Sequence, residues 1–193
     1  GVSNDNITSN TTPTFSGINA EAGAEIILTI AGNVYSTVVG SDGAWSVEVT
    51  DAITPDGINN YTIFARDLAG NESEIEGSIE IDTITQVTSR LAAQSDTGLS
   101  NSDNFTQERQ PMFTGTAEPG AIIDFILGAD SYTAVADING DWTINTTTTL
   151  ADSTYTYQVT ATDIAGNTAT SSNEFTVDND TQTLTGGQDA ASD

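Results

Sequence analysis

The sequence predicts an all-β protein made of two tandem β-sandwich domains in an elongated array. Three observations lead to this fold class. The chain of 193 residues repeats itself at intervals of about 97 residues, apolar residues alternate with polar ones, and Asp-Gly or Asn-Gly dipeptides separate the apolar runs. No segment sustains the 3.6-residue period of a helix, and the abundance of Thr and Val favours strands.

The internal repeat sets the domain organisation. Matched residues include Asp5 and Asp103, Pro13 and Pro111, Gly23 and Gly120, Trp45 and Trp142, and Asp67 and Asp163. Each copy has the length of an immunoglobulin-like sandwich. We therefore expect an Ig-like repeat over residues 1–87, a linker over 88–97, a second Ig-like repeat over 98–182, and the start of a linker to a further repeat over 183–193.

Alternation of apolar residues identifies the core strands of each copy. The residues expected to point inward are Ala24, Ile26, Leu28 and Ile30 with Ala121, Ile123, Phe125 and Leu127; Tyr61, Ile63 and Ala65 with Tyr157, Val159 and Ala161; and Ile79 and Ile81 with Phe175 and Val177. The Asp42-Gly43 and Asn139-Gly140 dipeptides fall between apolar runs, so they are expected to form hairpin turns. The tryptophan after each turn, Trp45 or Trp142, is expected to pack on the core or cover the hairpin.

Composition excludes several classes of function. The chain has 28 acidic and 3 basic residues, a formal charge of −25, and no His, Lys or Cys. Disulfides, imidazole or thiolate zinc sites, Ser-His-Asp triads and Lys Schiff bases are therefore impossible. Nucleic acid is excluded as a partner and direct membrane contact is not expected, because phosphate groups are bound by clustered Lys and Arg.

Several motifs occur in both copies and together resemble a known family. They are Pro-x-Phe-Ser/Thr-Gly at Pro13 and Pro111, Glu-x-Gly-Ala at Glu21 and Glu118, and Asp-x-Ala-Gly-Asn at Asp67 and Asp163. The combination resembles the bacterial Ig-like repeats of giant Gram-negative surface adhesins, including biofilm-associated and RTX adhesins exported by type I secretion. The resemblance implies extender domains at the cell surface, with calcium near the domain junctions stiffening the array.

The residues themselves also point to calcium. Oxygen ligands alone are available, which suits Ca²⁺ or Mg²⁺. In an Ig-type sandwich we expect the loop after the sixth strand to lie at the pole of the N-terminus. The predicted junction ligands are Asp82, Asp96, Asp103, Asp163 and Asn167, with an incomplete equivalent at Asp5, Asp67 and Asn71, and with Asp178, Asp180 and Asp193 awaiting a further repeat. Crowded like charges need a counter-ion, which a divalent cation supplies. An isolated aspartate could instead form an Asx-turn or lie solvated on the surface.

Two other functions compete with that of a spacer. A glycosidase needs two carboxyl groups at a defined separation in a cleft, whereas the recurring acids here fall in loops, so no enzyme is expected. An Ig-like module that itself binds a carbohydrate or protein remains the alternative, with Tyr155 as the aromatic specific to one copy. The stretch from Asp137 to Asp141 is similar to an EF-hand start but lacks the required Gly and Glu, so we interpret it as a hairpin.

The ends of the chain bear on its setting. The sequence starts in Gly1-Val2-Ser3-Asn4 and finishes at Asp193, one period after Asp96, which predicts a fragment of a longer array. No signal peptide is visible. We expect a monomeric, extracellular segment at the bacterial cell surface. Its partners would be the neighbouring Ig-like repeats of the same chain, and its adhesion target would lie outside this segment.

Overall fold

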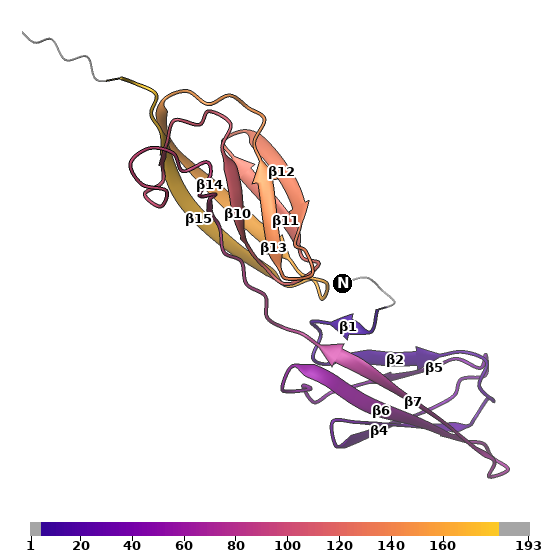
Figure 1. The fold of residues 1–193 in the computed structure, drawn as a ribbon. Coiled ribbons are helices and arrows are strands. Elements are labelled where there is room, and N and C mark those ends of the chain that lie inside the picture. Colours follow the sequence, from indigo (N-terminus) through magenta and orange to yellow (C-terminus); the bar gives the residue numbers. More distant parts are fainter. Residues whose placement is uncertain (1–4, 182–193) are drawn as a thin grey trace, which may run out of the picture.

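The computed structural model describes residues 5–181, which form two β-sandwiches joined end to end (Figure 1). Domain 1 comprises residues 5–82, with the Asp82 N–H donating to the Thr8 carbonyl, domain 2 comprises residues 88–181, and residues 83–87 connect them. The described residues contain strands and turns but no helix, which confirms the predicted all-β class. Accordingly, no helix that could cross a membrane is found in this part of the chain.

Domain 1 has seven strands in two sheets. The strands are β1 (Ile7–Thr8), β2 (Thr14–Gly17), β3 (Glu25–Ile30), β4 (Asn33–Val38), β5 (Trp45–Glu48), β6 (Gly57–Arg66) and β7 (Glu72–Ile81). One sheet has the order β1-β7-β6-β3-β4, and β2 pairs with β5 in the other. All pairs are antiparallel except β1 with β7.

Domain 2 repeats this arrangement with one additional strand. Its strands are β8 (Arg90–Leu91), β9 (Phe105–Thr106), β10 (Met112–Thr116), β11 (Ile122–Leu127), β12 (Asp130–Val135), β13 (Asp141–Asn145), β14 (Ser153–Thr162) and β15 (Thr168–Val177). The larger sheet has the order β12-β11-β14-β15-β9, and the smaller sheet β13-β10-β8.

The predicted inward faces form the two cores. Ala24, Ile26, Leu28 and Ile30 on β3 are buried, as are Ala121, Ile123, Phe125 and Leu127 on β11. The core of domain 2 also contains Phe113, Trp142, Tyr157 and Phe175, whereas the fully buried residues of the domain 1 core are aliphatic. Aromatic side chains are thus fully buried in the core of domain 2 and only partly buried in that of domain 1.

The glycines of the two predicted hairpin turns adopt the expected left-handed backbone. Gly43 has φ +79° and Gly140 has φ +83°, a region that residues with a side chain rarely occupy. Each glycine lies in the turn before the strand that carries the matched tryptophan, Trp45 or Trp142. A turn at both positions is confirmed, but the prediction of hairpins is wrong, because β4 and β5, like β12 and β13, belong to different sheets and do not pair. Each turn instead carries the chain from one sheet of the sandwich to the other.

The predicted linker over residues 88–97 is wrong, because this segment is built into domain 2. β8 pairs with β10, Leu91 packs in the domain 2 core, and the Thr88 N–H donates to the Thr116 carbonyl. The segment passes so close to β10 that a side chain at Gly115 would collide with the Thr88 carbonyl. The strand escaped prediction because two residues are too few to show alternation.

Domain 2 has two distinct poles, which decide where its acidic residues can meet. The turn of residues 163–167 precedes β15, whereas β9 runs parallel to the end of β15, with Phe105 opposite Thr176. β15 has ten residues, a length of about 30 Å. We call the end that faces domain 1 the near pole and the opposite end the far pole.

Candidate metal centre

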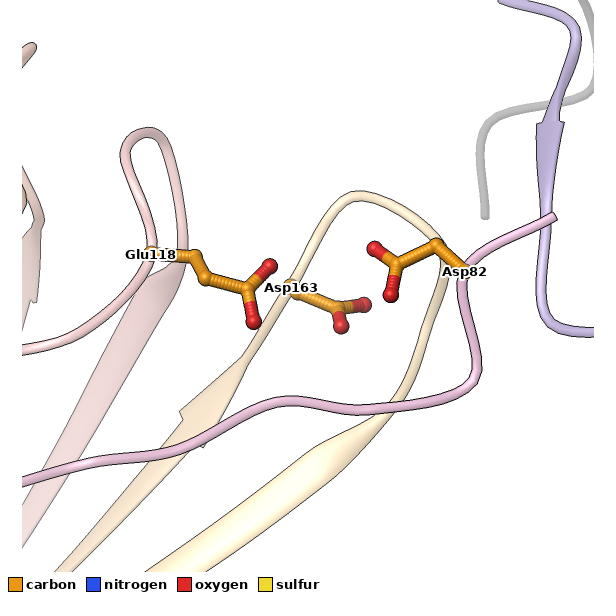
Figure 2. A group of neighbouring side chains, drawn as sticks. All are labelled: Asp82, Glu118 and Asp163. Atoms are coloured by element: carbon orange, nitrogen blue, oxygen red, sulfur yellow. The ribbon is translucent and has the colours of Figure 1, made fainter. Parts of the chain in front are cut away.

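Three carboxylate side chains converge where the domains meet (Figure 2). Asp82 follows β7 of domain 1, Glu118 lies in the turn between β10 and β11, and Asp163 follows β14. One oxygen of each carboxylate lies within 4.8 Å of an oxygen of the other two. Asp163 is 8% exposed, while Asp82 and Glu118 are half-buried. The cluster, which we call the junction triad, therefore draws on both domains.

The junction triad concentrates negative charge without an internal counter-ion. Among residues 5–181 the ion pairs are Arg66–Glu72 and Arg109–Asp152, neither of which involves the triad. Burial, and next the negative charges of Asp82 and Asp163, raise the pKa of Glu118 above its ordinary value. A proton or a cation would relieve this repulsion.

Hydrogen bonds hold Asp163 in place and tie the two domains together. Its carboxylate accepts the backbone N–H of Asn167 at 2.8 Å and the side-chain amide of Asn167 at 2.8 Å. The same amide nitrogen donates to the backbone carbonyl of Asp82, also at 2.8 Å. Asn167 was predicted as a ligand, and here its amide nitrogen bridges the domains.

A second direct contact lies beside this bridge. The Ser9 hydroxyl of domain 1 donates to the Ala165 carbonyl of domain 2 at 3.2 Å. Ala165 is buried, whereas its counterpart in domain 1, Ala69, is exposed. The difference shows that the 163–167 turn is covered by contact between the domains.

The geometry of the junction triad fits one bound calcium ion. Oxygen ligands lie 2.3–2.6 Å from Ca²⁺, so two ligands of one ion are at most about 5 Å apart. The triad oxygens satisfy this limit. The Thr85 hydroxyl of the connection is also buried and lies near Glu118. Carboxylate and hydroxyl oxygens are hard ligands of the kind that Ca²⁺ binds.

The structure separates Asp96 and Asp103 from this cluster. Asp96 accepts the backbone N–H of Asn104, and Asp103 caps the Phe105 N–H, so both lie at the far pole beside the end of β15. The prediction that they meet Asp82 and Asp163 is therefore wrong. Its cause is the assumed position of the N-terminal segment, which the parallel β9–β15 pairing places at the opposite pole.

The same error applies to the expected set in domain 1. Asp5 precedes β1, which pairs with the end of β7, whereas Asp67 and Asn71 lie before the start of β7. Asp67 accepts hydrogen bonds from the Asn71 side chain at 2.6 Å and the Asn71 backbone at 2.8 Å. These bonds from Asn71 lower the pKa of Asp67.

At the far pole Asp178 and Asp180 do come together, and they are joined by Asp152. All three are exposed. Arg109 pairs with Asp152 at 2.8 Å, and the Asp180 N–H donates to Asp178 at 3.0 Å. Asp193 lies outside the described residues, as does the predicted linker over 183–193.

Two members of these clusters, Glu118 and Asp152, were not predicted as ligands. A signal for both exists in the repeat, because Glu118 matches Glu21 and Asp152 matches Asp56. The motif Glu-x-Gly-Ala was recognised as a repeated element, but its acidic residue was not assigned to the junction. An acid that recurs at the same turn in both copies was the available indication.

Comparison with known proteins places the chain among Ig-like sequences. A family described as bacterial Ig-like domain matches residues 1–83 and again residues 83–179. No curated protein matches significantly.

Three solved structures resemble the fold. The tetra-tandem repeat in the extending region of a large adhesion protein is 22% identical, with a TM-score of 0.44, over 90% of this chain and 47% of that one. A Ca²⁺-stabilized adhesin that helps an Antarctic bacterium bind ice is 24% identical, with a TM-score of 0.45, over 91% and 46%. A 1.5-MDa bacterial ice-binding adhesin is 21% identical, with a TM-score of 0.49, over 90% and 60%. The chain thus spans about half the length of the first two, and the likeness is one of fold alone.

Proposed function

This chain belongs to the bacterial Ig-like domain family, and from that premise we propose that it is a calcium-binding spacer segment of a bacterial surface adhesin. In this role it binds one Ca²⁺ ion at Asp82, Glu118 and Asp163 and holds a distal ligand-binding module away from the cell. The segment is extracellular and has no enzymatic activity of its own. The single observation that carries the proposal is that both domains supply carboxylates to one cluster.

The ion would act by linking the domains mechanically. Without it, three like charges within 4.8 Å oppose close approach of the two sandwiches. With it, the same charges become shared ligands, and the connection of residues 83–87 loses conformational freedom. Because the unfolded chain lacks the assembled site, binding also stabilises the folded state by mass action. The hydrogen bonds of Asn167 and Ser9 already define the docked geometry that the ion would hold.

Both domains carry the parts needed to repeat this junction. Domain 1 presents Glu21, Asp67 and Asn71 at its pole away from domain 2, in the positions of Glu118, Asp163 and Asn167. The far pole of domain 2 presents Asp178 and Asp180 where domain 1 presents Asp82. We propose that these residues bind calcium with neighbouring repeats, which would make the array self-similar.

The rival function, recognition of a carbohydrate or protein by the domain itself, gains no support from its best candidate. Tyr155 stacks on Phe175 with ring centroids 5.6 Å apart, and its hydroxyl donates to the Ala151 carbonyl. The ring is thus part of the domain's own packing. An aromatic side chain that serves as a platform for a sugar must leave one face open.

Calorimetric titration of metal-stripped protein with CaCl₂ tests the proposal, alongside small-angle scattering in calcium and in chelator. We expect calcium to narrow the distribution of interdomain angles in the wild type and not in Asp163→Asn. Asp137→Asn is the matched control, because Asp137 is exposed and its carboxylate accepts hydrogen bonds from the Asn139 and Asp141 N–H groups of its own turn. Identical scattering profiles in calcium and chelator for the wild type would refute the spacer mechanism.

A further inference from the structure

A second acidic residue, Asp96 at the far pole of domain 2, is buried in a way that its protein contacts do not explain. Its side chain is 3% exposed. One carboxylate oxygen, Oδ2, accepts the Asn104 N–H at 3.2 Å. The other, Oδ1, is fully buried and has no hydrogen-bond partner among residues 5–181. A carboxylate held out of water with half of its acceptors unmet is strongly unfavourable unless another group compensates it.

Asp96 lies in a backbone segment that hydrogen bonds hold against the rest of domain 2. Its N–H donates to the Ala92 carbonyl at 2.9 Å, and the neighbouring Ser95 hydroxyl accepts the Met112 N–H at 2.9 Å. The Thr106 hydroxyl donates to the Ser95 carbonyl, and the Thr97 hydroxyl accepts the Gln107 N–H at 2.8 Å. These bonds attach the segment to β10 and to the residues that follow β9. The position of the carboxylate is therefore set by the fold.

Oδ1 belongs to a residue that lines a cavity whose polar walls are rich in oxygen. The cavity measures about 360 Å³ and is lined by Arg90, Leu91, Ala93, Asp96, Asn101, Ser102 and Asn104. Asn101, Ser102 and Asn104 offer amide and hydroxyl oxygens in addition to backbone carbonyls. Together with one carboxylate, these are the donors from which protein calcium sites are built.

Arg90 is the one cationic residue on the cavity wall, and it does not neutralise Asp96. The ion pairs among the described residues involve Arg66 and Arg109, so Arg90 makes none with Asp96. Arg90 is exposed and sits on β8, where it also borders a second cavity next to Thr114. The buried charge of Asp96 is thus left without a partner from the protein.

We propose that Asp96 is the charged ligand of a calcium site inside domain 2, completed by oxygens of the loop 97–104. This site lies at the far pole, separated from the junction triad by the length of β15, and it does not depend on the proposed junction ion. Its ligands come from one domain, so its occupancy stabilises the 95–106 segment and leaves the interdomain angle unchanged.

Residue-resolved NMR of the ¹⁵N-labelled full chain tests the site directly. On titration of metal-stripped protein with calcium to about 10 mM, above the Kd range of extracellular calcium modules, we expect the amide signals of Gly98, Asn101 and Asn104 to shift. In Asp96→Asn these shifts should be lost, while those of Asn167 persist. In Asp163→Asn the reverse should hold. The two ion sites are thus separable even if one of the two proposals fails.

The wild-type titration decides the question even if Asp96→Asn does not fold. Loop signals that stay unchanged up to about 10 mM calcium, or that still shift in a folded Asp96→Asn variant, would overturn the site. Arg90→Gln provides the second arm. Removing this positive charge should strengthen calcium binding at the loop in the titration. If Arg90→Gln instead lowers the thermal stability of the protein in chelator, Arg90 is the counter-ion of Asp96 and the proposal is overturned.

Discussion

Replacing Glu118 with Gln should have opposite effects on stability in the absence and in the presence of calcium. The substitution keeps the size of the side chain and removes one of three negative charges. In chelator the loss of charge relieves repulsion with Asp82 and Asp163, so domain 2 should become more stable. In calcium the same change removes a charged ligand, so the gain from ion binding should shrink.

The magnitude follows from the separation of the carboxylates. Two like charges about 5 Å apart repel by about 1 kcal/mol in water and about 3 kcal/mol at the effective dielectric of a site near the surface. Glu118 is half-buried and salt screens its exposed part, so we expect a net gain of about 1–3 kcal/mol in chelator. For a domain of this size, that corresponds to a rise in Tm of roughly 5–20 °C.

Calcium should reverse the order of the two proteins. At a calcium concentration of about 100 times Kd, ion binding stabilises the wild type by about 2.7 kcal/mol. A tenfold weaker site loses about 1.4 kcal/mol of that stabilisation. Differential scanning calorimetry in chelator and in calcium measures both terms.

Glu21→Gln is the matched control for this experiment. Glu21 occupies the same turn of domain 1, is exposed, and belongs to no cluster of three acids among the described residues. Its substitution should shift Tm little and by the same amount in both conditions. If Glu118→Gln is less stable than the wild type in chelator, or if calcium raises its Tm as much as it raises that of the wild type, the reasoning from repulsion and ligation is refuted.

Three further outcomes follow from the same structure. Asn167→Ala removes the bridge to the Asp82 carbonyl and should broaden the interdomain angles seen by scattering, whereas Asn71→Ala, its counterpart in domain 1, should not. Domain 1 should unfold before domain 2 in chelator, because its buried core lacks aromatic side chains; in Trp45→Phe, fluorescence of Trp142 should therefore change at a higher temperature than the first circular-dichroism transition. Because the pKa of Glu118 is raised in the folded protein, its protonated form stabilises the metal-free junction fully below the ordinary pKa of 4.5, and this contribution is lost as pH rises through the raised pKa. Calcium must displace that proton, so calcium affinity should fall on acidification. Calorimetry in buffers of different ionisation enthalpy should detect the released proton.

The fold was predictable because long-range repetition and short-range alternation agree. Alternating residues such as Ile26 and Leu28 predicted their own burial, and the matched Gly43 and Gly140 predicted turns that the backbone angles confirm. The strands that flank these turns lie in different sheets, which local sequence does not reveal. The alternation of apolar residues extends over four to ten residues of a strand and occurs in both copies of the repeat. A pattern that is both periodic and repeated is compatible with few folds.

The site was only partly predictable, because it depends on contacts that leave no periodic trace. β9 and β8 have two residues each, and their pairing decides which pole holds Asp103 and Asp96. Such short strands cannot be distinguished from loop by alternation, and nothing local specifies that β9 pairs in parallel. The convergence of Asp82 with Asp163 was correctly expected because it requires only that the 163–167 turn face the preceding domain.

The distribution of acids over the two poles bears on how the domains could act together. Domain 2 contributes two carboxylates of the junction triad and domain 1 contributes one. The outer poles of the two domains carry matching acids: Glu21 and Asp67 on domain 1 correspond to the pair from domain 2, and Asp178 on domain 2 corresponds to Asp82. Calcium takes six to eight oxygens, so neither half alone offers enough charged ligands to hold the ion strongly. The connection of residues 83–87 keeps the two halves at high effective concentration. Ion binding and docking of the domains would therefore be one coupled equilibrium, in which calcium favours the docked geometry by the same free energy with which docking favours calcium.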